Sequence, residues 1–453
     1  MSVAGAAVSR MSSLWPSPWP AEDGGGRRSQ AVGSGARLGI APGERLVCSA
    51  WRDAFACTMV VLREPGEVFL LRHTLGSRPL RDPIEAWVER IDPVTLEPVG
   101  VSPRLAAGPF WPGGMVAHGS GVLHVVCGRF CHRLSADLEL LASRELPRPR
   151  AYNSLVVLED GTLAMKDIDR EGRSAASLSL LDPDTLEPRC PERSLGEPVV
   201  ARLSCDGDRL YAVGVRNVFA LRWDGRRLDE EWRVGYLAGE AQSYGWDPVV
   251  AGGHLWLLDN GAHRYSTTMR GAGVSRGAVH LIRISLSDPE DFEAVEICGA
   301  SRGAVTDPPL YDPARRIALG YDSAAGVVAA FRFGERLEPL WRRSLSHAAH
   351  MLFYPESGEV VVHDFRGPAV GRTRVAHVAG QRAGFAARSR RVRRWSARRW
   401  GDDVVVLDIE TGEERARARV PSLFQSVLFP AAGWGRDLYW CTFSTVARLE
   451  VRS

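Results

Sequence analysis

The chain has 453 residues, of which 45% are apolar and 25% charged, with 46 glycines and 28 prolines; this composition excludes a disordered, a collagen-like and a disulfide-stapled protein. Its 57 basic and 54 acidic residues give a net charge of +3, but eleven arginines and no acid lie between Arg366 and Trp400, so the remainder carries −8. We therefore expect an acidic body with one strongly basic segment, and no apolar run reaches the roughly 18 residues that a membrane-spanning helix needs.

Residues 1–36 come first and are rich in glycine, serine and proline, which predicts a flexible N-terminal tail. The short apolar stretch from Val3 to Val8 has no positive charge before it, unlike a secretory signal. The eight cysteines are scattered, without a Cys-x-x-Cys pair. Because neither an export signal nor a disulfide framework is evident, we expect a cytoplasmic location.

Beyond the tail, one hairpin recurs along the chain. Residues 91–97 are Ile-Asp-Pro-Val-Thr-Leu-Glu, residues 181–187 are Leu-Asp-Pro-Asp-Thr-Leu-Glu, and residues 407–413 are Leu-Asp-Ile-Glu-Thr-Gly-Glu. Degenerate copies occur at 134–144, 221–233, 284–297 and 331–343, mostly 40 to 50 residues apart. A second hairpin precedes each copy, with Asp-Gly turns at Asp160 and Asp206. Each repeat is therefore predicted to form four antiparallel strands.

Four-stranded units at this period are typical of β-propeller blades, since one such sheet cannot bury both of its faces alone. We predict an all-β chain with a single propeller domain over residues 37–453 and eight blades, seven being the alternative and a two-domain β-sandwich the competing architecture. The expected blades are 53–103, 110–147, 151–196, 198–236, 245–298, 304–346, 348–420 and 424–453. The last has only three evident strands, so a strand near 37–48 is expected to complete it and to close the ring by pairing the N- and C-terminal strands.

The Asp-x-x-Thr-Gly-Glu of Asp408–Glu413, with Asp92 and Thr95 and then Asp182 and Thr185 as looser copies, resembles the repeat of quinoprotein-like (PQQ-like) and YVTN-type propellers. This resemblance implies the blade type and leaves the activity open. The last-strand tryptophan of the quinoprotein dehydrogenases occurs in blades four and six alone, as Trp232 and Trp341. The vicinal cysteine pair that stacks on the quinone in many members is absent. We therefore predict no cofactor, with PQQ or a divalent metal as the alternatives.

Polar residues gather where the loops of a propeller open around its axis, after each second strand and before each first strand. Convergent polar groups at a concave mouth are typical of a ligand site, although an aspartate at a strand end commonly accepts backbone N–H groups and shapes a turn. The predicted ligand-binding residues are Asn153, Lys166, Asp167, Tyr244, Trp246, Asp247, Asp259, Asn260, Asp307, Asp322 and Gln425.

Three histidines of blade seven, His347, His350 and His363, stand near Asp364 and are the candidate catalytic groups, because imidazole can shuttle protons or bind a metal. No metal site is predicted. The segments Leu258–Gly261 and Ser346–His350 also faintly resemble bacterial arylsulfotransferases. That resemblance implies a histidine nucleophile with an arginine to hold the sulfuryl group, and His350 or His263 with Arg264 or Arg302 could serve.

Two insertions interrupt the repeat, at 261–277 and 366–401, both between the second and third strands of a blade and hence on one face of the ring. The second interleaves arginine and tryptophan, a composition that suits contact with nucleic acid or an anionic membrane; a solvated loop is the alternative. The contact residues would be Arg390, Arg391, Arg393, Arg394, Trp395, Arg398, Arg399 and Trp400.

Two functions remain open from the sequence. The first is a scaffold that binds a small molecule or a protein through the funnel rim. The second is a propeller enzyme, either a quinoprotein-like oxidoreductase or an arylsulfotransferase-like sulfuryl transferase that uses rim histidines and aspartates. An enzyme should bring the histidines and nearby carboxylates together in one pocket, whereas in a binding module they should be dispersed or bonded to the backbone.

Overall fold

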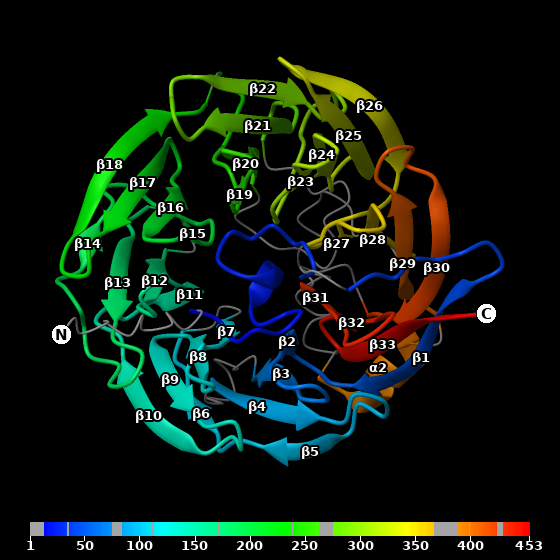
Figure 1. Cartoon of the computed structure of the whole chain (residues 1–453), viewed down its shortest axis with the longest axis horizontal. Coiled ribbons are helices and arrows are strands. Elements are labelled where there is room, and N and C mark those ends of the chain that lie inside the picture. Colours follow the sequence, from blue (N-terminus) through cyan, green and yellow to red (C-terminus); the bar gives the residue numbers. More distant parts are fainter. Residues whose placement is uncertain are drawn as a thin grey trace, which may run out of the picture.

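The computed structural model describes residues 13–33, 36–74, 84–109, 113–169, 173–237, 239–261, 275–366, 388–397, 399–423 and 429–453. These residues form eight sheets arranged in a ring (Figure 1), and each sheet is an antiparallel path of four strands. The predictions of an all-β chain and of an eight-bladed propeller are confirmed. The seven-blade and β-sandwich alternatives are wrong.

The strands follow the chain order blade by blade. The first blade holds β2 (Cys57–Leu62), β3 (Val68–His73), β4 (Glu85–Ile91) and β5 (Pro98–Val101), with the short β6 (Leu105–Ala106) also paired to β4. The second holds β7 (Gly114–Ala117), β8 (Leu123–Cys127), β9 (Phe130–Leu134) and β10 (Leu140–Glu145). The third holds β11 (Ala151–Val157), β12 (Leu163–Ile168), β13 (Ser177–Leu181) and β14 (Arg193–Ser194). The fourth holds β15 (Ser204–Asp206), β16 (Arg209–Val213), β17 (Asn217–Trp223) and β18 (Leu228–Gly235).

The second half of the ring repeats this plan. The fifth blade holds β19 (Val249–Ala251), β20 (His254–Leu258), β21 (His280–Ser285) and β22 (Phe292–Glu296). The sixth holds β23 (Leu310–Asp312), β24 (Ile317–Asp322), β25 (Val327–Phe333) and β26 (Leu337–Ser344). The seventh holds β27 (Leu352–Tyr354), β28 (Glu359–Phe365), β29 (Gly401–Asp408) and β30 (Glu414–Pro421). The eighth holds β31 (Phe429–Ala432), β32 (Asp437–Cys441), β33 (Thr445–Arg452) and β1 (Arg45–Asp53).

The recurrent hairpin owes its shape to one aspartate. Asp92 Oδ1 accepts hydrogen bonds from the backbone N–H groups of Val94 and Thr95 at 3.0 and 2.7 Å and from the Thr95 hydroxyl at 2.9 Å. Asp182 and Asp408 make the same three bonds in their own turns. This local network is an Asx turn, which reverses the chain between the third and fourth strands.

The two ends of the chain complete the eighth blade together. Strand β1 pairs antiparallel with β33, from Arg45 opposite Arg452 to Asp53 opposite Thr445. This pairing confirms the predicted closure, although the strand begins at residue 45 instead of residue 37. The apolar faces then pack blade on blade, so that one core cluster joins Leu70 of blade one, Val361 of blade seven and Trp440 of blade eight.

Residues 13–33, which we term the plug, occupy the centre of the ring (Figure 1). The plug accepts backbone hydrogen bonds from the innermost strands of five blades: from Leu62 to Trp19, Ala117 to Pro20, Cys205 to Gly26, Val250 to Arg27 and Phe353 to Gln30, at 2.7 to 2.9 Å. Innermost strands present unpaired N–H groups to the axis, and a buried N–H needs an acceptor. The prediction of a flexible tail is therefore wrong for residues 13–33.

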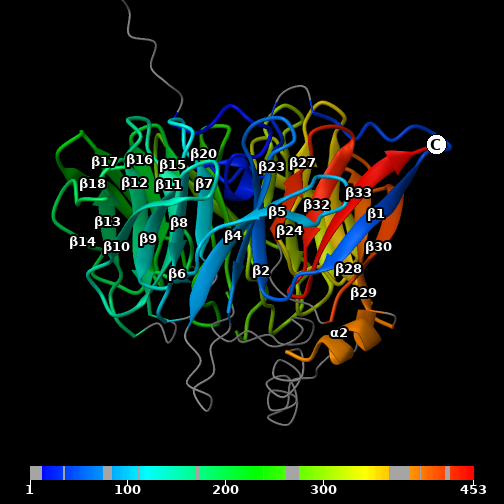
Figure 2. The ribbon, with the colours of Figure 1, turned by 90° about the horizontal axis from the view of Figure 1, so that it is seen from below.

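The second insertion carries one short helix. Helix α2 (Arg390–Ala397) lies between β28 and β29, and we term the side of the ring that bears it the α2 face. Figure 2 shows α2 on this face and the 3-10 helix η1 of the plug (Glu22–Gly24) nearer the opposite one. The first insertion lies between β20 and β21, as predicted. Among the helices of the described residues, none has the length and apolar character to cross a membrane.

Candidate functional site

A cluster of buried charged side chains stands on the axis, where the plug meets the loops that lead into the innermost strands. We term it the axial cluster; its members are Glu22, Asp23, Arg28, Arg202, Asp247, Asp307 and His350, and none is more than 6% exposed. The last four precede β15, β19, β23 and β27, the same step in four consecutive blades. Asp247 and Asp307 were predicted as ligand-binding residues and His350 as a catalytic candidate, and the structure places all three in this cluster.

Two arginines, one from the plug and one from the ring, share a single carboxylate. Arg28 Nη1 donates to Glu22 Oε1 and to Asp23 Oδ2, both at 2.7 Å, and Arg28 Nε donates to the Leu203 carbonyl at 2.6 Å. Arg202 Nη1 donates to Glu22 Oε2 at 2.8 Å. Both Glu22 oxygens are therefore bonded, and this carboxylate ties the plug to blade four through charge-assisted hydrogen bonds.

His350 lies between two carboxylates from opposite sides of the cluster. Its Nδ1 is 2.7 Å from Asp23 Oδ1 and its Nε2 is 3.0 Å from Asp307 Oδ1. Burial opposes the charge of the ring, but the carboxylates of Asp23 and Asp307 outweigh burial and raise the pKa of His350 to about 10. Nδ1 donates to Asp23, and Nε2 forms an ion pair with Asp307. Because the ring is protonated on both nitrogens below this pKa, His350 has no lone pair with which to act as a base at neutral pH.

Two other buried groups near the axis, Asp247 and Lys166, have pKa values closer to neutral pH. Asp247 Oδ1 accepts the backbone N–H of Arg202 at 2.6 Å, whereas its Oδ2 has no hydrogen-bond partner. Burial raises the pKa of Asp247 to about 6, against the opposing effect of Arg28 and Arg202. Lys166, the only lysine of the chain, donates to Asn153 Oδ1 at 2.7 Å and to the Val199 carbonyl at 2.9 Å. Burial lowers its pKa to about 7, although Asp167 favours the charged form.

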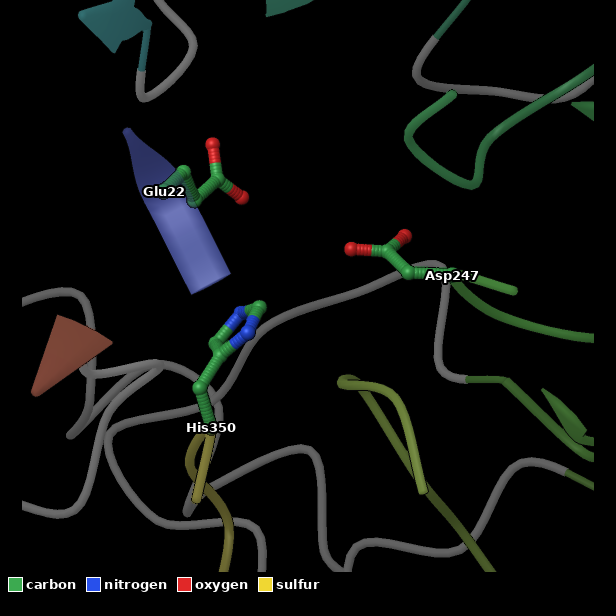
Figure 3. Close-up of side chains that lie close together, drawn as sticks. All are labelled: Glu22, Asp247 and His350. Carbon is green, nitrogen blue, oxygen red and sulfur yellow. The ribbon is translucent and has the colours of Figure 1, made fainter. Parts of the chain in front are cut away.

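Glu22, Asp247 and His350 point toward one another (Figure 3), and their potential ligand atoms lie within 4.8 Å of one another. No other set of three such residues in the described ranges is as close. Their hydrogen bonds do not fit a divalent cation. Arginines hold both oxygens of Glu22, and carboxylates hold both nitrogens of His350. Of these three residues, Asp247 alone keeps an atom available to bind a metal, its Oδ2. Two guanidinium groups beside Glu22 would also repel a cation.

The same contacts bear on a quinone cofactor of the PQQ type. The carboxylates of such a quinone need a cation that is free to pair with them. Arg28 and Arg202, the arginines of the axial cluster, both pair with Glu22. The His350 ring is likewise held by Asp23 and Asp307. The axial cluster therefore does not fit a PQQ-type quinone.

Four predicted site residues, Asp167, Asp259, Asp322 and Asp364, end the second strands of blades three, five, six and seven and accept backbone N–H groups. Asp167 accepts from Ser177 at 2.6 Å, Asp259 from His280 at 2.6 Å, Asp322 from Ala304, Ala324 and Ala325 at 2.9 to 3.3 Å, and Asp364 from Ser346 at 2.9 Å. These contacts match the turn-shaping alternative, since each aspartate fixes a connection on the α2 face.

Other predicted ligand-binding residues are also bonded inside the ring. Asn260 takes a left-handed backbone conformation, with φ of 60°, and its Oδ1 accepts the Ser243 backbone N–H at 2.8 Å. Tyr244 and Trp246 are buried in a small apolar cluster with Ala151, Ile168 and Val200. Asn153 Nδ2 donates to the Val200 carbonyl at 3.2 Å. Gln425 lies outside the described residues, as do His263, Arg264 and Arg398.

The other two histidines of the predicted catalytic set are buried. His363 Nε2 accepts the Ala348 backbone N–H at 2.7 Å, and its Nδ1 lies 3.1 Å from Asp402 Oδ1, so the hydrogen is on Nδ1. His347 Nδ1 accepts the His363 backbone N–H at 3.2 Å, and its Nε2 has no partner in the described part of the chain. Burial holds the pKa of His347 well below its usual value. Arg302 is exposed, so it is not joined to buried His350 in a sulfuryl-transfer pair.

Helix α2 is fastened to the ring by one arginine. Arg393 Nε and Nη2 donate to the two carboxylate oxygens of Asp53 at 2.6 and 2.9 Å, and its guanidinium lies 4.7 Å from the centroid of the Phe55 ring. Arg390, Arg391, Arg394, Trp395 and Arg399 are exposed instead. These eight residues therefore form a helix held against the ring and not a loop.

Sequence reasoning missed the plug half of the axial cluster. Glu22, Asp23 and Arg28 lie in the segment that was expected to be a flexible tail, and Gln30, also missed, donates to the Pro309 carbonyl at 2.6 Å. One signal could have found them: Trp19, which precedes Glu22 by three residues, is 1% exposed. A large indole in a polar tail indicates that the tail packs against a core.

The ring resembles two solved quinoprotein structures. A quinohemoprotein alcohol dehydrogenase from Pseudomonas putida HK5 aligns with a TM-score of 0.60 and 8% identity, over 96% of this chain and 80% of that chain. A europium-containing methanol dehydrogenase aligns with a TM-score of 0.59 and 8% identity, over 94% of this chain and 89% of that chain. No protein-family model and no curated protein sequence matches the chain. At such identities the likeness establishes the fold alone: the chain has the eight-bladed, quinoprotein-like β-propeller fold.

Proposed function

We propose that this chain is a binding scaffold that holds an anionic partner at the rim of its α2 face. One observation carries the proposal: the basic helix α2 is fastened to the ring through Arg393 and Asp53 and presents its other arginines to solvent. We term Arg390, Arg391, Arg394, Trp395 and Arg399 the basic patch. A rigid ring that supports an exposed charged surface is what a binding scaffold requires.

The axial cluster supports the same proposal because its charged groups are already paired with one another. The ionisable groups there bond to one another: His350 to Asp23 and Asp307, and Glu22 to Arg28 and Arg202. Partner binding at the axis would require the plug to leave five innermost strands. The rim needs no such rearrangement, so recognition at the rim has the lower free-energy cost.

Charge makes the basic patch selective for one sign of partner. The residues outside 366–400 carry a net charge of −8, so the body of the ring repels an anion that the patch attracts. Opposite charges on two parts of one surface orient an approaching partner and raise its association rate. The patch therefore favours an anionic partner that docks in one orientation.

Retention on immobilised heparin, a generic polyanion, tests the proposal with the full chain. The triple variant Arg390→Glu, Arg391→Glu, Arg394→Glu should elute at much lower salt than the parent. The matched control Arg226→Glu, Arg227→Glu, Arg336→Glu reverses three exposed arginines of blades four and six and should lose far less retention. Co-elution of the patch variant with the parent would refute the proposal.

A further inference from the structure

We infer that the basic patch binds single-stranded nucleic acid, an inference that rests on the proposed function. The patch combines three elements that such binding uses: cations at helical spacing, a positive charge that no acid of the segment offsets, and exposed aromatic surface.

Helical spacing brings the exposed side chains of α2 together. Residues four apart lie one above the other on a helix, so Arg390 stands beside Arg394 and Arg391 beside Trp395. All four are exposed, whereas Ser396 is buried and Arg393 faces Asp53 on the ring. The solvent side of α2 is thus a compact surface of three guanidinium groups and one indole.

The charge of this surface is compensated by one carboxylate alone among the described residues. No acid occurs between residues 366 and 400, and the nearest described carboxylate to Arg390 is Asp53, at 4.0 Å and already bonded to Arg393. Like charges four residues apart destabilise a helix, and a helix of eight residues is marginal by itself. Phosphate groups along the solvent side would relieve this repulsion, because guanidinium binds phosphate in a bidentate manner.

The exposed aromatic side chains favour nucleic acid over a lipid bilayer as the partner of the basic patch. The Trp395 side chain is 47% exposed, with the Arg399 guanidinium 4.7 Å from its ring centroid and Trp400 edge-on at 5.4 Å. Trp51, 48% exposed, lines a small cleft together with Arg394. Indole and guanidinium planes are stacking surfaces for unpaired bases. A membrane-bound helix instead needs an apolar face turned outward, and α2 turns arginines outward.

The inference predicts how strongly the binding constant should depend on salt concentration. Four exposed arginines, 390, 391, 394 and 399, can neutralise up to four phosphates. The slope of log Kobs against log salt for a single strand is about −0.7 per phosphate, or roughly −3 in all. Loss of one base stack typically weakens binding roughly 5- to 150-fold.

The experiment is a fluorescence-anisotropy titration of the full chain with fluorescein-labelled U20 RNA between 50 and 300 mM NaCl. We expect a salt slope near −3, loss of binding in the Arg390→Glu, Arg391→Glu, Arg394→Glu variant, and retention in the Arg226→Glu, Arg227→Glu, Arg336→Glu control. Trp395→Ala should weaken binding at least 5-fold and Trp395→Phe should restore most of it. Circular dichroism melting of each variant confirms that the ring is intact.

A second probe distinguishes failure of the nucleic-acid inference from failure of the proposed function. Vesicles of phosphatidylcholine with 30% phosphatidylserine are sedimented with the same variants. Retention on heparin without RNA binding, or binding to vesicles in place of RNA, would overturn the nucleic-acid inference and leave the proposed function standing. Failure on heparin, RNA and vesicles alike would overturn both. Equal RNA binding by Trp395→Ala and the parent would overturn the stacking part of the inference.

Discussion

Substitution of Lys166 by methionine should reveal a pH dependence of stability that the parent protein conceals. His350 keeps its proton in the fold up to a pKa of about 10, raised from 6.5. Its stabilisation is therefore complete below pH 6.5 and is lost as the pH rises toward 10. Lys166 has its pKa lowered from 10.5 to about 7 by burial. The fold gives up that proton before the unfolded chain does, so Lys166 makes stability increase over pH 7 to 10.5.

The two effects have opposite signs and nearly equal size. One pH unit corresponds to about 1.4 kcal/mol for each group, so from pH 7 to 8.5 each changes the free energy of unfolding by about 2 kcal/mol. This range stays below the usual pKa of 9.0 at which cysteine thiols, such as Cys127, lose their protons in the unfolded chain. The two effects should therefore cancel in the parent. Relative to the parent, Lys166→Met should lose about 2 kcal/mol across the range and His350→Gln should gain a similar amount.

Urea unfolding followed by tryptophan fluorescence at pH 7.0, 7.75 and 8.5, at constant ionic strength, measures these profiles. The control His254→Gln changes a histidine whose pKa is lowered by burial, so it releases its proton on the acid side of this range and the variant should keep the profile of the parent. A flat profile for Lys166→Met would refute the reasoning, because His350 would then not be held as an imidazolium by Asp23 and Asp307.

Two further predictions concern the axial cluster. Glu22→Gln removes the carboxylate shared by Arg28 and Arg202 and should cost about 3 to 5 kcal/mol in urea unfolding, whereas Glu145→Gln, an exposed partner of Arg129, should cost less than about 1 kcal/mol; equal losses would contradict the shared-carboxylate account. Dialysis against EDTA should leave Tm unchanged, since the donors of Glu22 and His350 are already bonded; a fall in Tm that added Ca²⁺ or Zn²⁺ reverses would show that a cation stabilises the fold.

The blades could be predicted because their determinants are local. The bonds of Asp92 to Thr95 span three residues, and the position after the threonine takes a left-handed φ of 64° at Leu96, 60° at Leu186 and 68° at Gly412. Such a turn is encoded within six residues, so its recurrence reports both the strand pairs and their number. Closure by an N-terminal strand followed from one missing strand in the last blade.

The centre of the ring could not be predicted because its determinants are distant in sequence. Arg28 donates to the Leu203 carbonyl across 175 residues, and His350 meets Asp23 across 327. Asp247, Asp307 and His350 could be singled out in the sequence because each lies at the step before a first strand. Nothing in the periodicity of residues 13–33 indicated their partners, since the plug has no regular repeat of its own and takes its order from the strands around it.

The pairing of β1 with β33 has a consequence for how the ring is made. Strand β1 and the plug before it are synthesised before the other seven blades, whereas the partner of β1, Thr445–Arg452, is synthesised after them. A nascent chain folds from its N-terminal end as it emerges, but β1 cannot pair until the other seven sheets and β33 have been made. Pairing of β1 with β33 is therefore a late step of folding, and a chain whose synthesis stops before the eighth sheet leaves β1 without its partner strand.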